Sequence, residues 1–248
     1  MASAWPAWFR ITVISGAKTV VQKSVSGEAT DTVENLISRI LPNIEELGII
    51  LEYHNDASLK RFLKGFQSTD GAFQAIIKSN KWRKEYGVSE LNEDTEVVQK
   101  YKKKNIAMLM RHRDMEGRPI IYIPARNHNV HERDIDELTK FIVFILEEAC
   151  KKCFEDVIDN LCIVFDLKDF SLNSMDYQFV KNLIWLLSKH YPERLGICVI
   201  TNAPTLFSGC WTVIRGWLSD VTANKVKFVG NEIELCNYLH PEILPENV

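Results

Sequence analysis

The sequence predicts an α/β protein in which an N-terminal helical bundle precedes a mainly parallel β-sheet with packed helices. Two observations lead to this fold class. In residues 31–88, apolar side chains recur at the spacing of amphipathic helices. From residue 106 onward, short β-branched runs alternate with helical patterns, and this alternation is typical of parallel strands joined by helical crossovers. A chain of 248 residues is long enough to bury a substantial core.

Composition and charge argue against several classes of protein. The formal net charge is only -3, so no global positive field indicates a nucleic-acid partner. The sequence contains no run of ~18 uninterrupted apolar residues, which argues against a transmembrane helix. The N-terminal stretch is apolar, but it lacks a basic start and Arg10 interrupts it, so we expect no signal peptide. Six scattered cysteines indicate free thiols in a reducing compartment, and we therefore expect a cytoplasmic protein.

The first predicted element is a helix over residues 31–47. Residues 1–30 before it show no clear helical period and are expected to form an N-terminal tail. Asp31 is a plausible N-cap for the helix, and Pro42 should kink or split it. Together with the two helices that follow, it is expected to form a small helical domain over residues 31–88.

Two further helices are predicted in the first half of the chain. Asn55 precedes one of them, which runs through the sequence SLKRFLKGF. The other begins near Thr69 and ends at Gly87, a residue type that commonly terminates helices. Residues 89–104 are rich in charge and are expected to be a polar connection.

The spacing of apolar residues changes from a helical to a strand-like pattern at the start of the second half of the chain. Apolar runs at Ile106–Met110 and Ile120–Ile123 flank a turn at Asp114–Gly117, so they predict a hairpin. The remaining elements are expected in alternating order: a helix from 135 to 146, a strand from 161 to 167, a helix from 175 to 190, a strand from 197 to 200, a helix from 206 to 218 and a strand from 226 to 229.

The helix expected over residues 206–218 is apolar on most of its surface, with few charges to mark a solvent face. Ordinary core packing is one interpretation. The other is a helix that closes over an apolar ligand, which Gly209 and Gly216 favour because glycine widens the choice of backbone conformation. The apolar side chains expected to face such a ligand are Phe207, Trp211, Ile214, Trp217 and Leu218.

Four motifs resemble the CRAL-TRIO family of lipid-binding proteins in order and spacing. They are WRKEYG (82–87), RHRDMEGRPI (111–120), FDLKDFSL (165–172) and HYPERLGICVITNAP (190–204). That family includes retinaldehyde- and tocopherol-binding members and a fungal phosphatidylinositol/phosphatidylcholine transfer protein. The resemblance runs from about Thr32 to Val248. It implies a lipid-binding domain over residues 89–248, with an apolar cavity on one face of the sheet and a mobile gate helix at Leu206–Leu218.

The resemblance also implies a site for a lipid headgroup. In members that hold phosphatidylinositol, the residues around the inositol phosphate match Glu193, Thr222 and Lys225, and Arg194 lies beside the first of them. Lysine and a hydroxyl can donate to a phosphate, while a carboxylate can accept from inositol hydroxyls or orient the lysine. The alternative is a structural ion pair between Glu193 and Arg194 at the start of the strand.

The sequence departs from the family pattern in two places. Phe66 stands where family members carry a phosphate-contacting arginine, and Lys64 would sit at a different angle on that helix. The hydroxyls and tyrosines of the family's choline site are replaced by apolar residues, which would favour a sterol, an isoprenoid or another bulky hydrophobe. The expected cavity lining comprises Ile106, Met108, Met110, Leu161, Ile163, Phe165, Cys198 and Ile200.

Signatures of metal binding and catalysis are incomplete. No further ligands complete the C-x-x-C of Cys150–Cys153 or the H-x-x-H-E of His128–Glu132, so no metal site is expected. The usual motifs for hydrolases, nucleotides and dinucleotides are missing from the sequence. The resemblance makes Asp166 and Asp169 structural. We expect no cofactor other than a bound lipid and no enzymatic activity.

These observations favour lipid binding and transfer between membranes. One hydrophobic molecule would occupy the cavity, with phosphatidylinositol as one candidate, and the gate would open at a membrane with which the protein associates peripherally. The alternative is a lipid-sensing module that recruits a larger protein to membranes or to a protein partner. The chain stops at LPENV, where family members continue with a Gly-Gly pair, so we expect a fragment of a longer protein.

Overall fold

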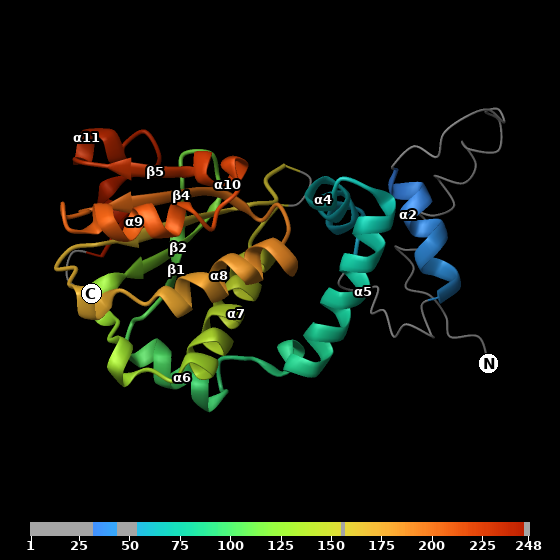
Figure 1. The fold of residues 1–248 in the computed structure, drawn as a ribbon, viewed down its shortest axis with the longest axis horizontal. Coiled ribbons are helices and arrows are strands. Elements are labelled where there is room, and N and C mark those ends of the chain that lie inside the picture. Colours follow the sequence, from blue (N-terminus) through green and yellow to red (C-terminus); the bar gives the residue numbers. More distant parts are fainter. Residues whose placement is uncertain (1–31, 44–53, 155–156, 246–248) are drawn as a thin grey trace.

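Five strands form one sheet in the computed structural model, which describes residues 32–43, 54–154 and 157–245. Their spatial order follows the chain (Figure 1). The first two strands are antiparallel and all later neighbours are parallel, so the hairpin and the mainly parallel sheet are confirmed. The strands are β1 (Met108–Arg113), β2 (Pro119–Pro124), β3 (Leu161–Asp166), β4 (Leu195–Thr201) and β5 (Val226–Val229).

Three helices of the N-terminal half share a core of their own. They are α2 (Val33–Ile40), which continues as a short 3-10 turn over Leu41–Asn43, α4 (Asp56–Phe66) and α5 (Thr69–Tyr86). Their buried apolar residues form one cluster separate from the cores around the sheet, namely Leu36, Ile40, Leu59, Phe62, Ala72, Phe73, Ala75 and Ile76. The division of the chain into a helical domain over residues 31–88 and a lipid-binding domain over residues 89–248 stays a prediction.

Capping residues mark the ends of these helices close to the expected positions. Asn55 accepts a hydrogen bond from the backbone of Ser58 and begins α4, as predicted. Gly87 ends α5 with a φ of 69°, a conformation that favours glycine. Thr32 caps α2, because its side chain accepts from the backbone of Asn35. The expected tail at 1–30, the Asp31 cap and the end of the first helix at 44–47 lie outside the described residues.

The expected polar connection contains a helix, α6 (Glu96–Lys103). Val98 and Tyr101 are buried on one of its faces, while the rest of the helix is mostly charged. One apolar pair three residues apart is a weak helical signal, and the sequence therefore did not predict a helix within this connection. The later helices are α7 (Ile135–Lys151), α8 (Tyr177–Lys189), α9 (Phe207–Arg215), and two short elements that the sequence did not predict, α10 (Asp220–Asn224) and α11 (Glu232–Leu235).

Alternation along the strands divides the sheet into two apolar faces. One face is covered by α7, α8 and α9, which lie in front of the sheet in Figure 1. The opposite face packs against α11 and the C-terminal segment. The first face includes Ile121, Ile123, Ile163, Phe165, Cys198 and Ile200, and the second includes Ile120, Tyr122, Cys162, Val164 and Val199.

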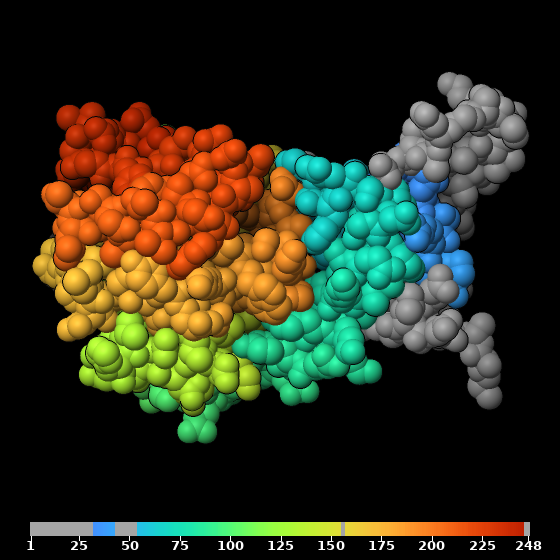
Figure 2. Space-filling view, in the orientation of Figure 1, coloured from blue at the N-terminus to red at the C-terminus, as the bar shows by residue number. Residues whose placement is uncertain are grey.

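The N-terminal helices pack against one end of the sheet and its covering helices (Figures 1 and 2). The Arg83 guanidinium on α5 makes two hydrogen bonds of 2.9 and 2.7 Å to the carboxylate of Glu147 on α7. The same carboxylate accepts a 2.5 Å hydrogen bond from the hydroxyl of Tyr191, in the loop before β4. One buried network thus joins the N-terminal helices to the segment that carries the expected headgroup residues.

Candidate functional site

A cavity of about 560 Å³ lies between the sheet and the helices on its first face. Its floor comes from β2, β3 and β4, and its other walls come from α8, α9 and the segment that follows α9. Apolar side chains dominate this lining, including Ile123, Phe179, Leu183 and Leu187. A cavity of this size with a mostly apolar wall can hold an extended hydrophobic molecule.

Five of the residues expected to line a cavity lie on its wall: Ile106, Ile163, Phe165, Cys198 and Ile200. The prediction was wrong for Met108 and Met110. Met108 pairs with Tyr122 and Leu109 pairs with Ile121, so the register turns both methionines toward the opposite face. The strand begins at Met108, and Ile106 reaches the cavity from the segment before it.

Leu161 is also a correction. It lies on the same face of β3 as Ile163 and Phe165, but it belongs to the fully buried core beneath α7 and does not reach the cavity. The cavity therefore begins about one strand pleat further along β3 than the sequence suggested.

All five side chains expected on the apolar helix meet the cavity: Phe207, Trp211, Ile214, Trp217 and Leu218. The helix itself is shorter than predicted, because α9 ends at Arg215 and the last two of these residues follow it. Trp217 packs edge-on against the ring of Tyr177 with 5.7 Å between centroids. The Nζ atom of Lys181 lies 4.7 Å from the centre of the same indole ring.

Three of the four expected headgroup residues come together at one rim of the cavity: Glu193, Thr222 and Lys225. The carboxylate of Glu193 lies 2.8 Å from the ammonium of Lys64, which reaches the rim from α4. Lys225 donates a 2.8 Å hydrogen bond to the carbonyl oxygen of Leu195, which holds its side chain along the start of β4. An ammonium has three donors, so this contact leaves Lys225 able to bind an anion.

A smaller polar hollow of about 250 Å³ adjoins this rim and shares Lys64, Glu193 and Lys225 with the cavity. It adds the cations Lys60, Arg61 and Arg118 together with the carboxylate of Asp159. Figure 2 shows a recess where the orange C-terminal half meets the teal surface of the N-terminal helices. Sequence reasoning missed Lys60 and Arg61, although their position one turn before Lys64 on an amphipathic helix was a usable signal.

Arg194, the fourth expected headgroup residue, does not line either hollow. Its side chain is buried, and its Nη1 atom donates a 2.6 Å hydrogen bond to the carbonyl oxygen of Asp159. Glu193 pairs with Lys64 rather than with Arg194, whose guanidinium is turned toward Asp159. Phe66 also points away from the rim: it packs in the helical core, 6.0 Å from the ring of Phe62.

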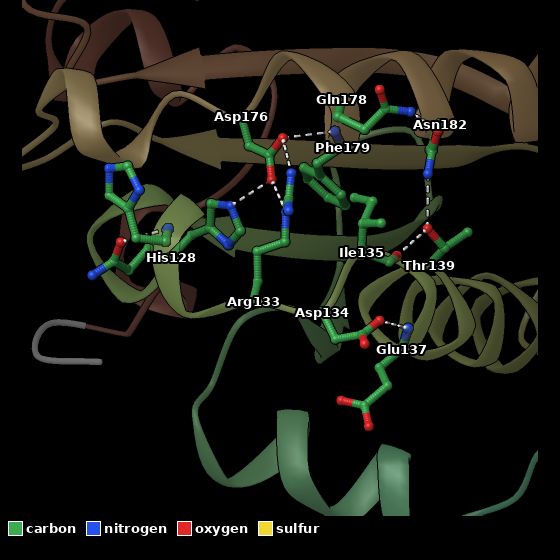
Figure 3. A network of polar contacts seen from close by, with 12 residues as sticks. His128, Arg133, Asp134, Ile135, Glu137, Thr139, Asp176, Gln178, Phe179 and Asn182 are labelled. Carbon is green, nitrogen blue, oxygen red and sulfur yellow. Dashed lines mark hydrogen bonds and ion pairs between the residues drawn. The ribbon is translucent and has the colours of Figure 1, made fainter.

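A second polar group lies at the other end of the cavity, where the parallel strands end (Figure 3). His128 and Asp176 both line the cavity there, and 3.1 Å separates Nε2 of the imidazole from the carboxylate. Arg133 donates to both oxygens of Asp176, at 2.7 and 3.2 Å. Asp176 also caps α8 by accepting from the backbone of Phe179.

Electrostatics fix the charges in this second polar group. Burial opposes ionisation of Asp176, but hydrogen bonds from Arg133, the Phe179 backbone and His128 outweigh it and hold the pKa of the carboxyl below its ordinary value. Burial lowers the pKa of His128, and the neighbouring carboxylate offsets only part of that effect. The ground state at neutral pH is therefore a neutral imidazole beside a carboxylate.

The sequence suggested His128 only as part of a possible metal motif. In the structure, His131 and Glu132 of that motif are exposed, while His128 turns inward to Asp176. No group of three His, Cys, Asp or Glu side chains in the described ranges is arranged to hold a metal ion. The partnership with Asp176 had no local signal, because 48 positions separate the two residues.

Asp166, at the end of β3, has the structural surroundings that the resemblance implied. Its carboxylate accepts hydrogen bonds from Tyr122 at 2.5 Å, Arg126 at 2.6 Å and Asn202 at 2.7 Å. These contacts tie together the ends of three neighbouring strands and leave the carboxylate fully occupied.

Comparison with known proteins agrees with this geometry. The profile described as CRAL/TRIO domain matches residues 103–248, which is more than half of the chain. The chain belongs to the CRAL/TRIO domain family. A CRAL-TRIO domain-containing protein of Schizosaccharomyces pombe is 33% identical over 196 residues, covering 75% of this chain and 44% of that protein.

Two further relatives are a phosphatidylinositol transfer protein and a cytosolic factor. A phosphatidylinositol transfer protein of Eremothecium gossypii is 35% identical over 132 residues, covering 53% of this chain and 30% of that protein. The Sec14 cytosolic factor of Schizosaccharomyces pombe is 26% identical over 230 residues, covering 83% of this chain and 77% of that protein. The chain thus spans less than half the length of the first two of these three relatives.

A solved structure shares the architecture of this chain. The crystal structure of Sfh5 superposes with a TM-score of 0.66 at 17% sequence identity, covering 86% of this chain and 85% of that one. At this identity the likeness concerns the fold alone. Within the described part of the CRAL/TRIO chain, every helix is too short or too polar to cross a membrane.

Proposed function

We propose that this protein binds one lipid at a time in its apolar cavity and exchanges it with membranes, without changing the lipid chemically. The observation that carries the proposal is the cavity of about 560 Å³ with an apolar wall and a cationic rim. An apolar chain gains free energy in such a cavity in proportion to the surface removed from water. A charged or hydroxylated headgroup would stay at the rim, where polar and charged side chains can bind it.

The rim suits an inositol phospholipid. Lys225 and Lys64 supply positive charge for a phosphate, and Thr222 supplies a hydroxyl. Glu193 can accept hydrogen bonds from inositol hydroxyls while it holds Lys64 in place. The name of the relative from Eremothecium gossypii, a phosphatidylinositol transfer protein, supports the same headgroup.

Lipid exchange requires the cavity to open. We assign this role to α9 together with the turn that follows it. Its inner side contributes Phe207, Trp211 and Ile214 to the cavity, while Val213 is exposed on its outer side and Leu206 is exposed just before the helix begins. A helix with exposed apolar side chains beside its cavity-facing side can trade contacts with a ligand for contacts with a bilayer. Tryptophans suit the membrane interface, so Trp211 and Trp217 would enter it when the helix moves.

The test is to incubate the protein with vesicles of mixed lipid composition, re-isolate it, and analyse its organic extract by mass spectrometry. Stoichiometric phosphatidylinositol, together with catalytic transfer of that lipid between two vesicle populations, is the expected result. A neutral hydrophobe in the extract would still support lipid transfer, but it would show that the rim residues do not select an inositol phosphate. An empty extract would refute lipid exchange and favour a module that recruits a larger protein to membranes.

A further inference from the structure

We infer that the cavity takes a long apolar alcohol, such as a sterol or an isoprenoid alcohol, whose hydroxyl donates a hydrogen bond to Nδ1 of His128. This inference rests on the proposed lipid-binding function and names a ligand class for the same cavity. It depends on the polar contacts of His128, Arg133 and Asp176 (Figure 3). His128 and Asp176 line the end of the cavity that lies away from the cationic rim.

The two polar ends of the cavity are separated by the length of α8. Asp176 caps the first turn of this helix, and the segment that contains Glu193 follows its last turn. A helix of 13 residues is about 20 Å long. Apolar side chains of α8 line the cavity along this path, from Phe179 to Leu187. An elongated hydrophobe lying parallel to α8 therefore brings one of its ends to His128.

The hydrogen bonds around His128 decide which kind of ligand group fits. Asp176 is ionised and can only accept, so Nε2 of the neutral imidazole must carry the proton and donate to it. Nδ1 is then left as an acceptor. Among the described residues it has no hydrogen-bond partner, although the side chain is only 9% exposed and lines the cavity.

An unpartnered acceptor inside an apolar cavity selects a ligand by what that ligand can donate. A hydroxyl supplies one donor and little other polarity, so it satisfies Nδ1 and leaves the rest of the molecule to the apolar wall. A ketone, ester or ether of the same shape has no donor to offer. A carboxylate would place a second negative charge close to Asp176, which disfavours fatty acids.

No described side chain around His128 donates a hydrogen bond to Nδ1. Arg133 is committed to both oxygens of Asp176, and the ring of Phe179 lies beside the imidazole at 5.9 Å between centroids. A purely structural link to Asp176 needs one ring nitrogen, and Nε2 already serves it. The second nitrogen is consequently the one polar atom of this side chain that a ligand can satisfy.

The test uses the full chain and two matched pairs of probes: cholesterol with its 3-O-methyl ether, and geranylgeraniol with its methyl ether. Binding is followed by the fluorescence of the tryptophans that line the cavity. Each alcohol is expected to bind about 10-fold more tightly than its ether, since the ether leaves Nδ1 unsatisfied. In His128→Phe the ratio should fall to about 1, whereas His131→Phe, in the same loop but exposed, should keep it.

A ratio near 1 for both pairs in the unmodified protein would overturn the inference, and this comparison does not depend on whether any variant folds. An unchanged ratio in folded His128→Phe would overturn it as well. If the protein still carries phosphatidylinositol from mixed vesicles, only the alcohol inference fails. If it takes up no lipid at all, the proposed function fails with it.

Discussion

The ammonium of Lys64 lies 2.8 Å from the carboxylate of Glu193, across the junction between the N-terminal helices and the sheet. The hydrogen bond to Glu193 raises the pKa of Lys64 above its ordinary value. The contact depends on a close approach of the two segments: a Cβ atom on Gly65 would come within 3.0 Å of the Pro192 side chain. Glycine at position 65 thus lets α4 deliver a cation to the cavity rim.

The rim cations should determine how tightly the protein holds an inositol lipid. We expect Lys225→Ala and Lys64→Ala each to weaken phosphatidylinositol binding about 10-fold, because each removes a charged donor to the phosphate. Binding of a neutral hydrophobe should change little. Lipid uptake from vesicles measures both quantities, and Lys78→Ala, an exposed lysine on α5, is the control. If Lys225→Ala weakened the binding of phosphatidylinositol and of the neutral hydrophobe equally, Lys225 would have a structural role.

Restoring the family's arginine at position 66 should fail to improve headgroup binding. Phe66 packs in the helical core, so Phe66→Arg should destabilise the protein by about 2 kcal/mol without placing a charge at the rim. Lys64→Arg, two positions away, keeps a cation beside Glu193 and should preserve or strengthen phosphatidylinositol binding. Urea unfolding and lipid uptake compare the two variants. Tighter binding by Phe66→Arg would show that this helix can rotate.

Sequence patterns predicted the elements well where the signal was local. Asn55 and Gly87 were identified as helix ends because capping depends on the residue and its immediate neighbours. The wall of the cavity was harder to predict. The strand register turns Met108 away from the cavity, and this register is visible only from its pairing with Tyr122.

The site contains contacts that no local sequence pattern predicts. His128 and Asp176 follow neighbouring parallel strands, β2 and β3, and they meet only because those strands end at the same edge of the sheet. Lys64 was noted beside the expected phosphate site, yet its place at the rim depends on how α4 docks against Pro192. Docking between elements far apart in the sequence decided both cases.

Trp217 should influence the rate of lipid exchange more than the affinity. A carboxylate at this position would oppose entry of the segment into a membrane interface, so Trp217→Asp should slow transfer between vesicles by about 10-fold. Equilibrium uptake of lipid should fall less than the rate does. Met115→Asp, an exposed apolar residue in the β1–β2 turn, serves as the control. Parallel losses of rate and affinity in Trp217→Asp would mean that the indole simply fills the cavity wall.

Glu147 should be essential to the junction between the N-terminal helices and the sheet. Glu147→Ala removes the shared acceptor of the largely buried Arg83 guanidinium and the Tyr191 hydroxyl. We expect a loss of about 3 kcal/mol in the free energy of unfolding. The adjacent Glu148 forms a surface ion pair with Lys151, so Glu148→Ala should cost less than about 1 kcal/mol. Comparable effects of the two substitutions in urea unfolding would contradict this assignment.

His190 should make the stability of this junction depend on pH. Its ring stacks on Trp82 with 3.8 Å between centroids, and Nδ1 lies 3.2 Å from the hydroxyl of Ser79. Burial lowers the pKa of His190 to about 4, and the positive charges of Arg83 and Lys189 add to the effect. Between that value and the ordinary pKa of about 6.5, the unfolded chain binds a proton that the folded chain does not.

The stability that His190 contributes is therefore complete above pH 6.5 and declines as the pH falls toward 4. At pH 5 the loss attributable to this one group is about 2 kcal/mol relative to pH 7. His190→Gln cannot take up the proton, so the difference in unfolding free energy between pH 7 and pH 5 should shrink by that amount. Urea titrations of both proteins at the two pH values make the comparison, in which other titrating groups cancel. An identical pH dependence in the two proteins would mean that the folded junction accepts a proton on His190 without penalty, which the burial of this ring and the nearby charges of Arg83 and Lys189 argue against.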